Sequence, residues 1–263
     1  MSRQAPPHAQ VPAVQRLRVR FAKRGRLRFV SHRDFQRALE RALRRAEVPI
    51  AYSQGYTPHP KISYAGAAPT GAASEAEYLE MALTRSCAPD AVRAGLDAAL
   101  PPGLDVLEVV EAAPGSLADR LHASVWQVRL PGVPVDRAED AVRALLAEPV
   151  VEVERLTKNG VRTLDARAPV LAVGVSPDSS SSDPCAILDV VVRHGTPTVR
   201  PDDVLAGLRR VADLVPPQPP QATRLAQGPL DEPSGTVGDP LAPDRDSART
   251  RGPAVATTVA TDA

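Results

Sequence analysis

Two short segments near the N-terminus hold most of the residues whose types and spacing could do chemistry. Segment 23–34 reads KRGRLRFVSHRD, and segment 55–63 reads GYTPHPKIS. Each contains a restricted histidine: His32 follows a serine suited to cap a helix, and His59 lies between two prolines that stiffen its backbone. The positive end of a helix macrodipole favours a neutral imidazole at His32. A neutral histidine together with Lys61, one of three lysines in the chain, suits RNA binding or metal-free RNA cleavage.

Positive charge is concentrated around both segments. Residues 16–64 hold 13 Lys and Arg against 3 Asp and Glu, a net charge of +10, whereas residues 65–122 hold 3 against 9, a net charge of −6. Such a basic block can either face a polyanion or fold against the acidic block. For the first case we predict a nucleic-acid contact set of Lys23, Arg26, Arg28, Arg33, Arg37, Arg41, Tyr56, His59 and Lys61.

Structural explanations compete with each of these functional ones. An arginine stripe opposite an apolar stripe is usually the solvated face of a helix. A histidine at a helix start is more often a structural hydrogen-bonding group than a catalyst. His32, His59 and Lys61 are therefore catalytic candidates only, and no catalytic residue is assigned.

A second group of polar residues lies in segment 71–80, which reads GAASEAEYLE. Glu75 and Glu77 share one face of any strand here, so they could form ion pairs with the basic block or accept a proton. We favour the ion pairs, because no His or Asp partners for a metal stand nearby. The sequence has no Walker loop, GxGxxG, HExxH, GxSxG or CxxxCxxC motif, and Cys87 and Cys185 stand alone.

Hydrophobic periodicity predicts the elements that must position these residues. Alternation predicts a strand at 17–21, and helical spacing predicts a helix at 32–46 that Ser31 caps and Asp34 supports. With strands at 62–66, 77–83 and 104–110 and a helix at 89–100, the order is β-α-β-β-α-β, that of a ferredoxin-like domain. A second round predicts strands at 123–130, 150–156, 168–175 and 187–192 and helices at 135–147 and 201–212.

We therefore predict an α+β fold of two ferredoxin-like units in tandem, a basic N-terminal domain at 16–115 and a second α+β unit at 116–214. Residues 1–15 and the Pro/Ala-rich tail at 215–263 show no helical or strand period and are predicted to be disordered. Residues 176–184 are predicted to form an exposed loop. With no signal-peptide segment and no long apolar run, the sequence predicts a cytoplasmic protein without membrane contact.

Three strings of residues resemble a known family in order and spacing. They are K-x-G-x-L-R-F-x-S-H-x-D from Lys23 to Asp34, SQGYTPHPK from Ser53 to Lys61, and G-x-x-S-x-x-E-Y from Gly71 to Tyr78. Over about residues 16–212 the chain resembles the radical-SAM-linked proteins, a group of unknown function. The motif residues that it shares are Gly25, Phe29, Ser31, His32, Asp34, Gly55, Pro58, Pro60, Gly71, Ser74 and Glu77.

The resemblance implies a stand-alone accessory partner of a radical S-adenosylmethionine enzyme, since members of that family are encoded beside such an enzyme or fused to it. S-adenosylmethionine and an iron–sulfur cluster are then expected only on the partner enzyme, and no cofactor on this chain. Our first hypothesis is a non-catalytic module that presents RNA, either tRNA or rRNA, to that enzyme. One alternative is a metal-independent endoribonuclease with His32 or His59 as general base and Lys61 stabilising the charged transition state. The other is a protein–protein adaptor that binds no nucleic acid.

Overall fold

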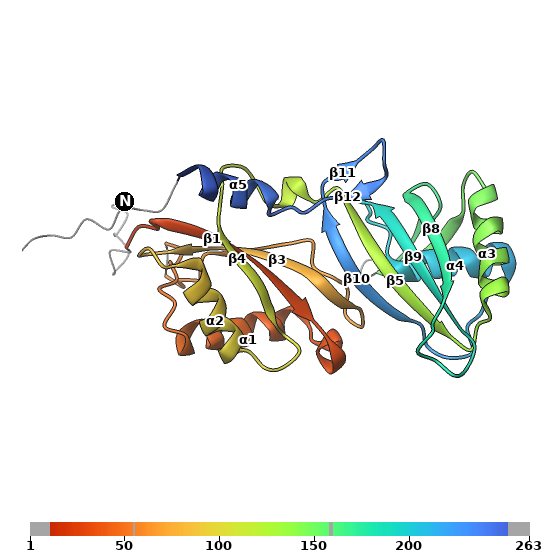
Figure 1. Ribbon diagram of the computed structural model, residues 1–263, viewed down its shortest axis with the longest axis horizontal. Coiled ribbons are helices and arrows are strands. Elements are labelled where there is room, and N and C mark those ends of the chain that lie inside the picture. The colour runs from red at the N-terminus through yellow and green to blue at the C-terminus, as the bar shows by residue number, and fades with distance from the viewer. Residues whose placement is uncertain (1–10, 55, 158–159, 252–263) are drawn as a thin grey trace, which may run out of the picture.

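The computed structural model describes residues 11–54, 56–157 and 160–251. One eight-stranded sheet runs through this part of the chain in the order β4-β1-β3-β10-β5-β9-β8, and β2 pairs with β3 beside it (Figure 1). The N-terminal half contains β1 (Gln15–Lys23), the 3₁₀ helix η1 (Gly25–Phe29), α1 (His32–Arg45), β2 (Ile62–Ala65), β3 (Ala73–Leu83), α2 (Pro89–Ala99) and β4 (Val106–Glu111).

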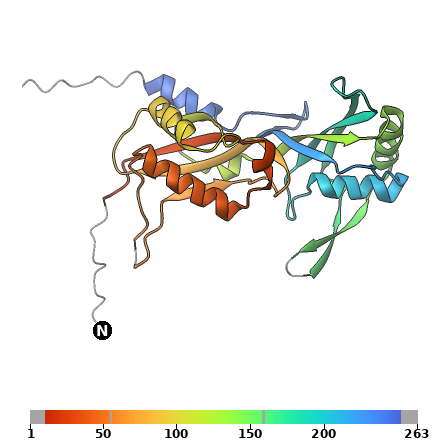
Figure 2. The same ribbon diagram turned by 90° about the horizontal axis from the view of Figure 1, so that it is seen from below.

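The second half begins after a short 3₁₀ helix, η2 (Ala118–Arg120). It contains β5 (Ala123–Pro131), α3 (Val135–Ala147), the hairpin β6 (Glu152–Thr157) and β7 (Gly160–Asp165), β8 (Val170–Pro177), β9 (Cys185–Arg193), α4 (Pro201–Ala212) and β10 (Gln221–Gly228). The β6–β7 hairpin projects away from the sheet (Figure 2). The chain then forms β11 (Leu230–Asp231), β12 (Thr236–Val237) and α5 (Ala242–Arg251).

The predicted α+β class is confirmed: the described residues form five α-helices and a mostly antiparallel sheet. The bounds of the predicted helices agree with those of the structure to within one residue at each end. The agreement follows because the apolar residues whose spacing predicts each helix are also the residues that the helix buries. Between β1 and α1 the chain forms the 3₁₀ helix η1, which Gly25 opens with a φ of +54°. That the two halves are ferredoxin-like stays a prediction.

The predicted disorder of the tail is wrong over residues 221–251. β10 pairs with β5 along its whole length and with β3 at Thr223 and Arg224, so a segment of the supposed tail joins the two halves of the sheet. The segment after the PPQPPQ run is polar and carries no local signal of a strand. The strand forms because of its pairing partners, which lie far away in the sequence. The last residue of the predicted N-terminal arm at 1–15, Gln15, belongs to β1. Residues 1–10 and 252–263, for which disorder was also predicted, lie outside the described residues.

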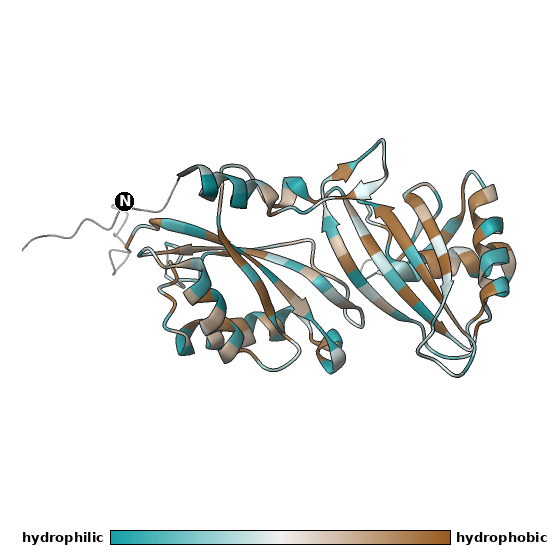
Figure 3. Ribbon diagram, in the orientation of Figure 1, coloured by the Kyte–Doolittle hydropathy of each residue, from teal (hydrophilic) through white to brown (hydrophobic). Residues whose placement is uncertain are grey.

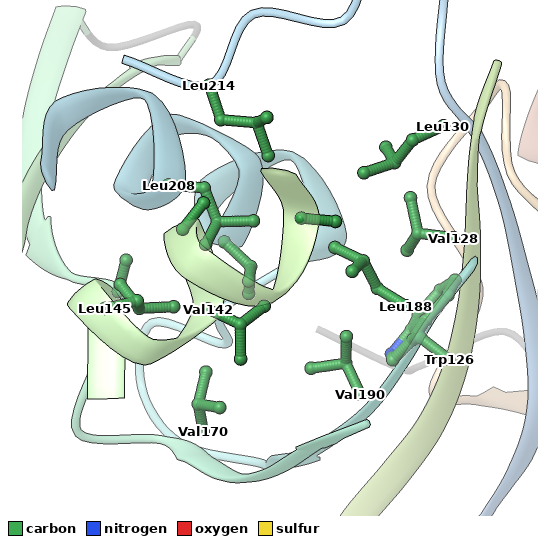
Figure 4. Close-up of a cluster of buried hydrophobic side chains, with 14 of the residues drawn as sticks. Trp126, Val128, Leu130, Val142, Leu145, Val170, Leu188, Val190, Leu208 and Leu214 are labelled. Carbon is green, nitrogen blue, oxygen red and sulfur yellow. The ribbon is translucent and has the colours of Figure 1, made fainter. Parts of the chain in front are cut away.

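Each half has its own apolar core. In the N-terminal half α1 and α2 pack on one face of the sheet, with Phe35, Leu39 and Leu43 of α1 buried. In the second half, side chains of β5, β8 and β9 meet those of α3 and α4 (Figure 4). Ala, Val and Leu supply most of this packing, as the scarcity of aromatic residues requires.

Helix α5 lies on the opposite face of the N-terminal sheet from α1 and α2 (Figure 1). It is hydrophilic over nearly its whole length (Figure 3), so it has no apolar stripe to bury. Ion pairs attach it instead: Asp244 is completely buried and accepts hydrogen bonds from Arg18 (2.6 Å) and Arg120 (2.8 Å). No helix in the described ranges combines the length and apolar character needed to cross a membrane.

Candidate functional site

The first and third motif strings meet at a pocket of about 510 Å³ between the two halves. The end of β1 contributes Lys23, the start of α1 contributes Ser31 and His32, and β3 contributes Glu77. Aromatic side chains form much of the wall, and the second half closes one side with the start of α4. Residues that line this pocket are Phe21, Lys23, Val30, Ser31, His32, Phe35, Tyr64, Ala67, Ala68, Pro69, Thr70, Glu77, Tyr78, Arg200 and Asp202.

Helix capping places the first two polar residues of the pocket. Ser31 caps α1, as predicted: its hydroxyl accepts a hydrogen bond from the Asp34 backbone N–H (3.1 Å) and donates one to the Asp34 carboxylate (2.7 Å). The His32 ring packs edge-on against Tyr64, with centroids 4.7 Å apart, and its Nε2 lies 3.1 Å from Nε2 of Gln36. Burial raises the pKa of Tyr64 to about 12, and the nearby Glu40 charge adds to the shift, so its phenol is neutral across the physiological range.

Lys23 is the unusual residue of the pocket, because its side chain is only 6% exposed. Burial lowers the pKa of this ammonium, the Arg224 charge lowers it further, and the Glu77 carboxylate opposes the shift. Its one hydrogen bond among the described residues is a long one, 3.3 Å from Nζ to the Pro69 carbonyl oxygen. Lys23 was predicted to be a nucleic-acid contact; it lies in the wall of the pocket and not on the exposed surface of η1 and α1, and its contact with nucleic acid stays a prediction.

Glu77 is held by Arg224 of β10 and by the backbone of Ala68. Its carboxylate accepts a hydrogen bond from the backbone N–H of Ala68 (3.1 Å) and forms a buried ion pair with Arg224 of β10. Arg224 also donates to the hydroxyl of Ser74 (3.3 Å) and lies over the Trp126 ring. The motif residues Ser74 and Glu77 therefore fix β10 in place, whereas an ion pair between Glu77 and the basic block was expected.

A second pocket of about 460 Å³ adjoins the first and shares Pro69, Thr70 and Asp202 with it. Phe29 lines it with 58% of its surface exposed, and the Arg28 guanidinium lies 4.5 Å from the centre of that ring. Gly71 closes this part of the wall: its N–H donates to the Arg28 carbonyl oxygen (2.8 Å), and its φ of +97° is one that side chains rarely tolerate. The two pockets form one cleft, and η1 lies at the edge of the N-terminal half that faces the second half (Figure 1).

The basic block divides into two parts with different partners. On β1 and just after it, Arg18 pairs with Glu80 and Asp244, and Arg24 pairs with Glu75 and Asp105, so this part folds against the acidic block. The arginines of η1 and α1 point outward, and within the described part of the chain only Arg37 and Arg44 reach a carboxylate, both at a loose 3.9 Å. The arginines of η1 and α1 that form no ion pair with any described residue are Arg26, Arg28, Arg33, Arg41 and Arg45.

The second motif string lies apart from the cleft. His59 is exposed and lines a different pocket of about 420 Å³ with Glu40 and Arg44, near the C-terminal end of α1. The backbone fixes this loop: the Ser53 N–H donates to the His59 carbonyl oxygen, and Lys61 N–H donates to the Ala51 carbonyl oxygen, both at 2.7 Å. Tyr56, Pro58 and Lys61 are exposed, and Pro60 forms an isolated bridge with Tyr52. Gly55 lies outside the described residues.

Three residues of the site were missed from sequence. Arg224 and Arg200 lie in the second half or beyond it, and no local pattern connects them with Glu77. Tyr64 follows the second motif string directly on a predicted strand, and its alternation with Ile62 could have placed it on the buried face. The described residues contain no group of three or more His, Cys, Asp or Glu side chains placed to hold a metal ion.

Replacing Lys23 with Met should change how stability depends on pH. Because the pKa of Lys23 is lower in the folded chain than the ordinary 10.5, the unfolded chain holds the extra proton between the two values. As the pH rises through that window, wild type should gain unfolding free energy relative to Lys23→Met, by at most about 1.4 kcal/mol per pH unit. Tyr64 is present in both proteins, so its titration cancels in the difference between their unfolding free energies. Urea unfolding at several pH values below 10.5 measures the difference; a difference independent of pH would contradict the burial of the charge.

Comparison with known proteins gives a family for the chain and no activity. No curated protein matches it. A family model described as an uncharacterized protein conserved in bacteria, DUF2344, matches residues 16–201, which include all three motif strings and the residues of the first pocket up to Arg200. Because the match spans well over half of the 263 residues, this chain belongs to the DUF2344 family of bacteria.

Proposed function

We propose that this protein is a non-catalytic RNA-binding module that presents its substrate to a radical S-adenosylmethionine enzyme in the cytoplasm. The observation that carries the RNA part is the outward row of arginines on η1 and α1, with few carboxylate partners, beside an open cleft. Phosphate binding by such cations is independent of sequence and sensitive to salt. The exposed Phe29 ring at the cleft adds a stacking surface of the kind that single-stranded RNA uses.

The enzyme partner rests on the resemblance to the radical-SAM-linked proteins. Residues of two of its motif strings gather at one cleft, which supports a shared role for them in binding. S-adenosylmethionine and the iron–sulfur cluster would belong to the partner enzyme, and tRNA or rRNA would be the bound substrate.

We also propose that the two halves are ferredoxin-like units in tandem. The N-terminal half has the sequence order β1-α1-β2-β3-α2-β4 and the spatial order β4-β1-β3-β2. With the β6–β7 hairpin set aside as an insertion, the second half follows the same pattern: β5-α3-β8-β9-α4-β10 in sequence and β10-β5-β9-β8 in space. On this proposal β10 is the last strand of the second unit, and the unit extends beyond residue 214.

The full-length protein should retain RNA from total cellular RNA, less strongly as the salt concentration rises. The triple variant Arg33→Glu/Arg37→Glu/Arg41→Glu should lower the slope of log affinity against log salt by about one unit for each phosphate that the helix no longer neutralises. Filter binding or fluorescence anisotropy at two salt concentrations measures both quantities.

A matched control has the same change in net charge on exposed arginines of the second half, Arg143→Glu/Arg162→Glu/Arg210→Glu. It should bind RNA nearly as well as wild type. Equal losses in the two triple variants would make the effect one of net charge alone. Absence of retained RNA at low salt would overturn the proposal in favour of an adaptor without nucleic acid, and cleavage of the retained RNA by the pure protein would overturn it in favour of a nuclease.

A further inference from the structure

We infer that the first pocket binds a small organic anion, whose charged group lies on Lys23 and whose apolar part lies against the aromatic wall. The charged group is a carboxylate or a phosphate, since either offers the oxygen acceptors that an ammonium requires. Such a site lies inside the pocket and is independent of the RNA-binding surface proposed on α1. Lys23 itself, the balance of buried charge around it and the pocket wall each support this assignment.

Lys23 has more hydrogen-bond donors than partners. Its side chain is only 6% exposed, yet it lines the pocket. The ammonium carries three N–H donors, and within the described ranges one of them makes a hydrogen bond, 3.3 Å long, to the Pro69 carbonyl oxygen. A buried charged donor without a partner carries a desolvation cost that a ligand oxygen removes. The side chain is therefore placed to donate to a ligand in the pocket.

The buried charges around Lys23 do not balance. Among the described residues, the charges that act on Lys23 are those of Glu77 and Arg224, and both of these side chains are nearly inaccessible to water. Glu77 already forms an ion pair with Arg224, so with Lys23 protonated the three groups together keep one positive charge. The other charged residues of the lining, Arg200 and Asp202, are exposed and opposite in sign, so they leave this sum unchanged. Buried charges are normally paired, and an anion on Lys23 supplies the missing partner.

The wall of the pocket suits an apolar ring rather than a bare inorganic ion. A volume of about 510 Å³ lies in the usual range for small-molecule sites, which are mostly apolar with few polar groups. Phe21 and Phe35 stack with centroids 4.5 Å apart, and Tyr64 meets Phe35 edge-on at 6.0 Å. Burial raises the pKa of both Tyr64 and Tyr78 to about 12, so both phenols stay neutral across the physiological range and do not repel an anion. The ligand that fills this space is therefore an organic anion.

The test is calorimetry of small probes with the full-length chain. Benzoate and phenyl phosphate each carry an anionic group on a ring, and benzamide is the uncharged analogue of benzoate. At least one of the two anions should bind at millimolar concentration, at least about tenfold more tightly than benzamide, because a hydrogen bond to a charged group commonly contributes that much. The stronger of the two anions names the anionic group, carboxylate or phosphate.

A second comparison tests the role of the wall. The stronger anion should bind more tightly than its counterpart without the ring, acetate for benzoate or inorganic phosphate for phenyl phosphate, because the counterpart leaves the aromatic wall uncovered. The inference would be overturned if neither anion bound more tightly than benzamide, or if the counterpart without the ring bound as tightly as the stronger anion.

Three variants locate the site. Lys23→Met should weaken binding of the anion at least about tenfold, and its melting temperature shows whether the fold is kept. Ala67→Trp keeps Lys23 but fills the lining from an exposed position, so it should block the anion as well. Arg143→Met removes one positive charge from an exposed residue of the second half and should leave anion binding unchanged. Unchanged binding in a folded Lys23→Met or in Ala67→Trp would overturn the inference, and so would an equal loss in Arg143→Met.

The outcomes for the pocket and for the basic surface of α1 are separable. Retention of RNA without binding of either anion would sink the pocket site alone. Binding of an anion without retention of RNA would sink the RNA-binding function and leave the pocket as a small-molecule site.

Discussion

A chain that ends at Val215 should fail to reach the folded state. The truncation removes β10, which pairs with β5 from Gln221 to Gly228 and touches β3 on its other side. Without it, β5 becomes an open strand edge and β3 loses its partner at Ala73 and Ser74, and an open edge promotes aggregation. The expected result is a chain that elutes as aggregate in gel filtration and shows no cooperative unfolding by urea.

Side chains of β10 add to the destabilisation that removing its backbone causes. Gln227 is completely buried, and its amide donates to the carbonyl oxygens of Ala76 (2.7 Å) and Gly66 (3.1 Å) in the N-terminal half. Arg224 makes the buried ion pair with Glu77. Removing the strand therefore also removes several buried hydrogen bonds to the N-terminal half, each of which contributes about 0.5–1.5 kcal/mol.

A matched truncation after Arg251 separates this effect from a general one of shortening the chain. It keeps β10, α5 and the Asp244 ion pairs, and it should elute as the full-length protein does and melt at the same temperature. If the chain ending at Val215 melted cooperatively at the wild-type temperature, β10 would not be the strand that joins the two halves.

Which parts of this structure can be predicted from the sequence depends on how far apart the interacting residues lie along the chain. The helices and most strands follow from local apolar spacing, and the Ser31 cap follows from two residues three apart. Glu77 and Arg224 are 147 residues apart, and only the three-dimensional sheet brings them together. The sequence therefore predicts the first motif string as a site but cannot tell that Lys23 is inside the pocket and His59 outside it.

The tail shows why composition misleads. A segment rich in Pro, Ala and Thr buries little apolar surface by itself, which is the reason to predict disorder. β10 is nevertheless ordered, because its neighbours β3 and β5 supply the backbone hydrogen bonds and two buried polar side chains supply the rest. α5 follows the same principle, since Asp244 and Arg245 form ion pairs with Arg18, Arg120 and Glu108 in place of apolar burial.

Replacing Arg224 with Met should destabilise the protein by about 3–5 kcal/mol, the usual result of removing one partner of a buried ion pair. Arg224 and Glu77 are both nearly inaccessible to water, so the Glu77 carboxylate would keep the Ala68 N–H and the nearby Lys23 charge but lose its closest cation. Urea unfolding at neutral pH measures the destabilisation. The same substitution at Arg193, whose ion pair with Glu232 is exposed, should cost less than about 1 kcal/mol.

The double variant Glu77→Gln/Arg224→Met tests whether the destabilisation comes from the stranded charge. Glutamine keeps the shape of Glu77 and can still accept from the Ala68 N–H, but it removes the buried charge that Arg224→Met leaves behind. The double variant should therefore be more stable than the sum of the two single effects implies, with a coupling of about 0.5–3 kcal/mol. Additive effects would mean that Arg224 acts through its packing on Trp126 alone. A positive coupling would instead show that the buried ion pair itself links β10 to Glu77 in the wall of the first pocket.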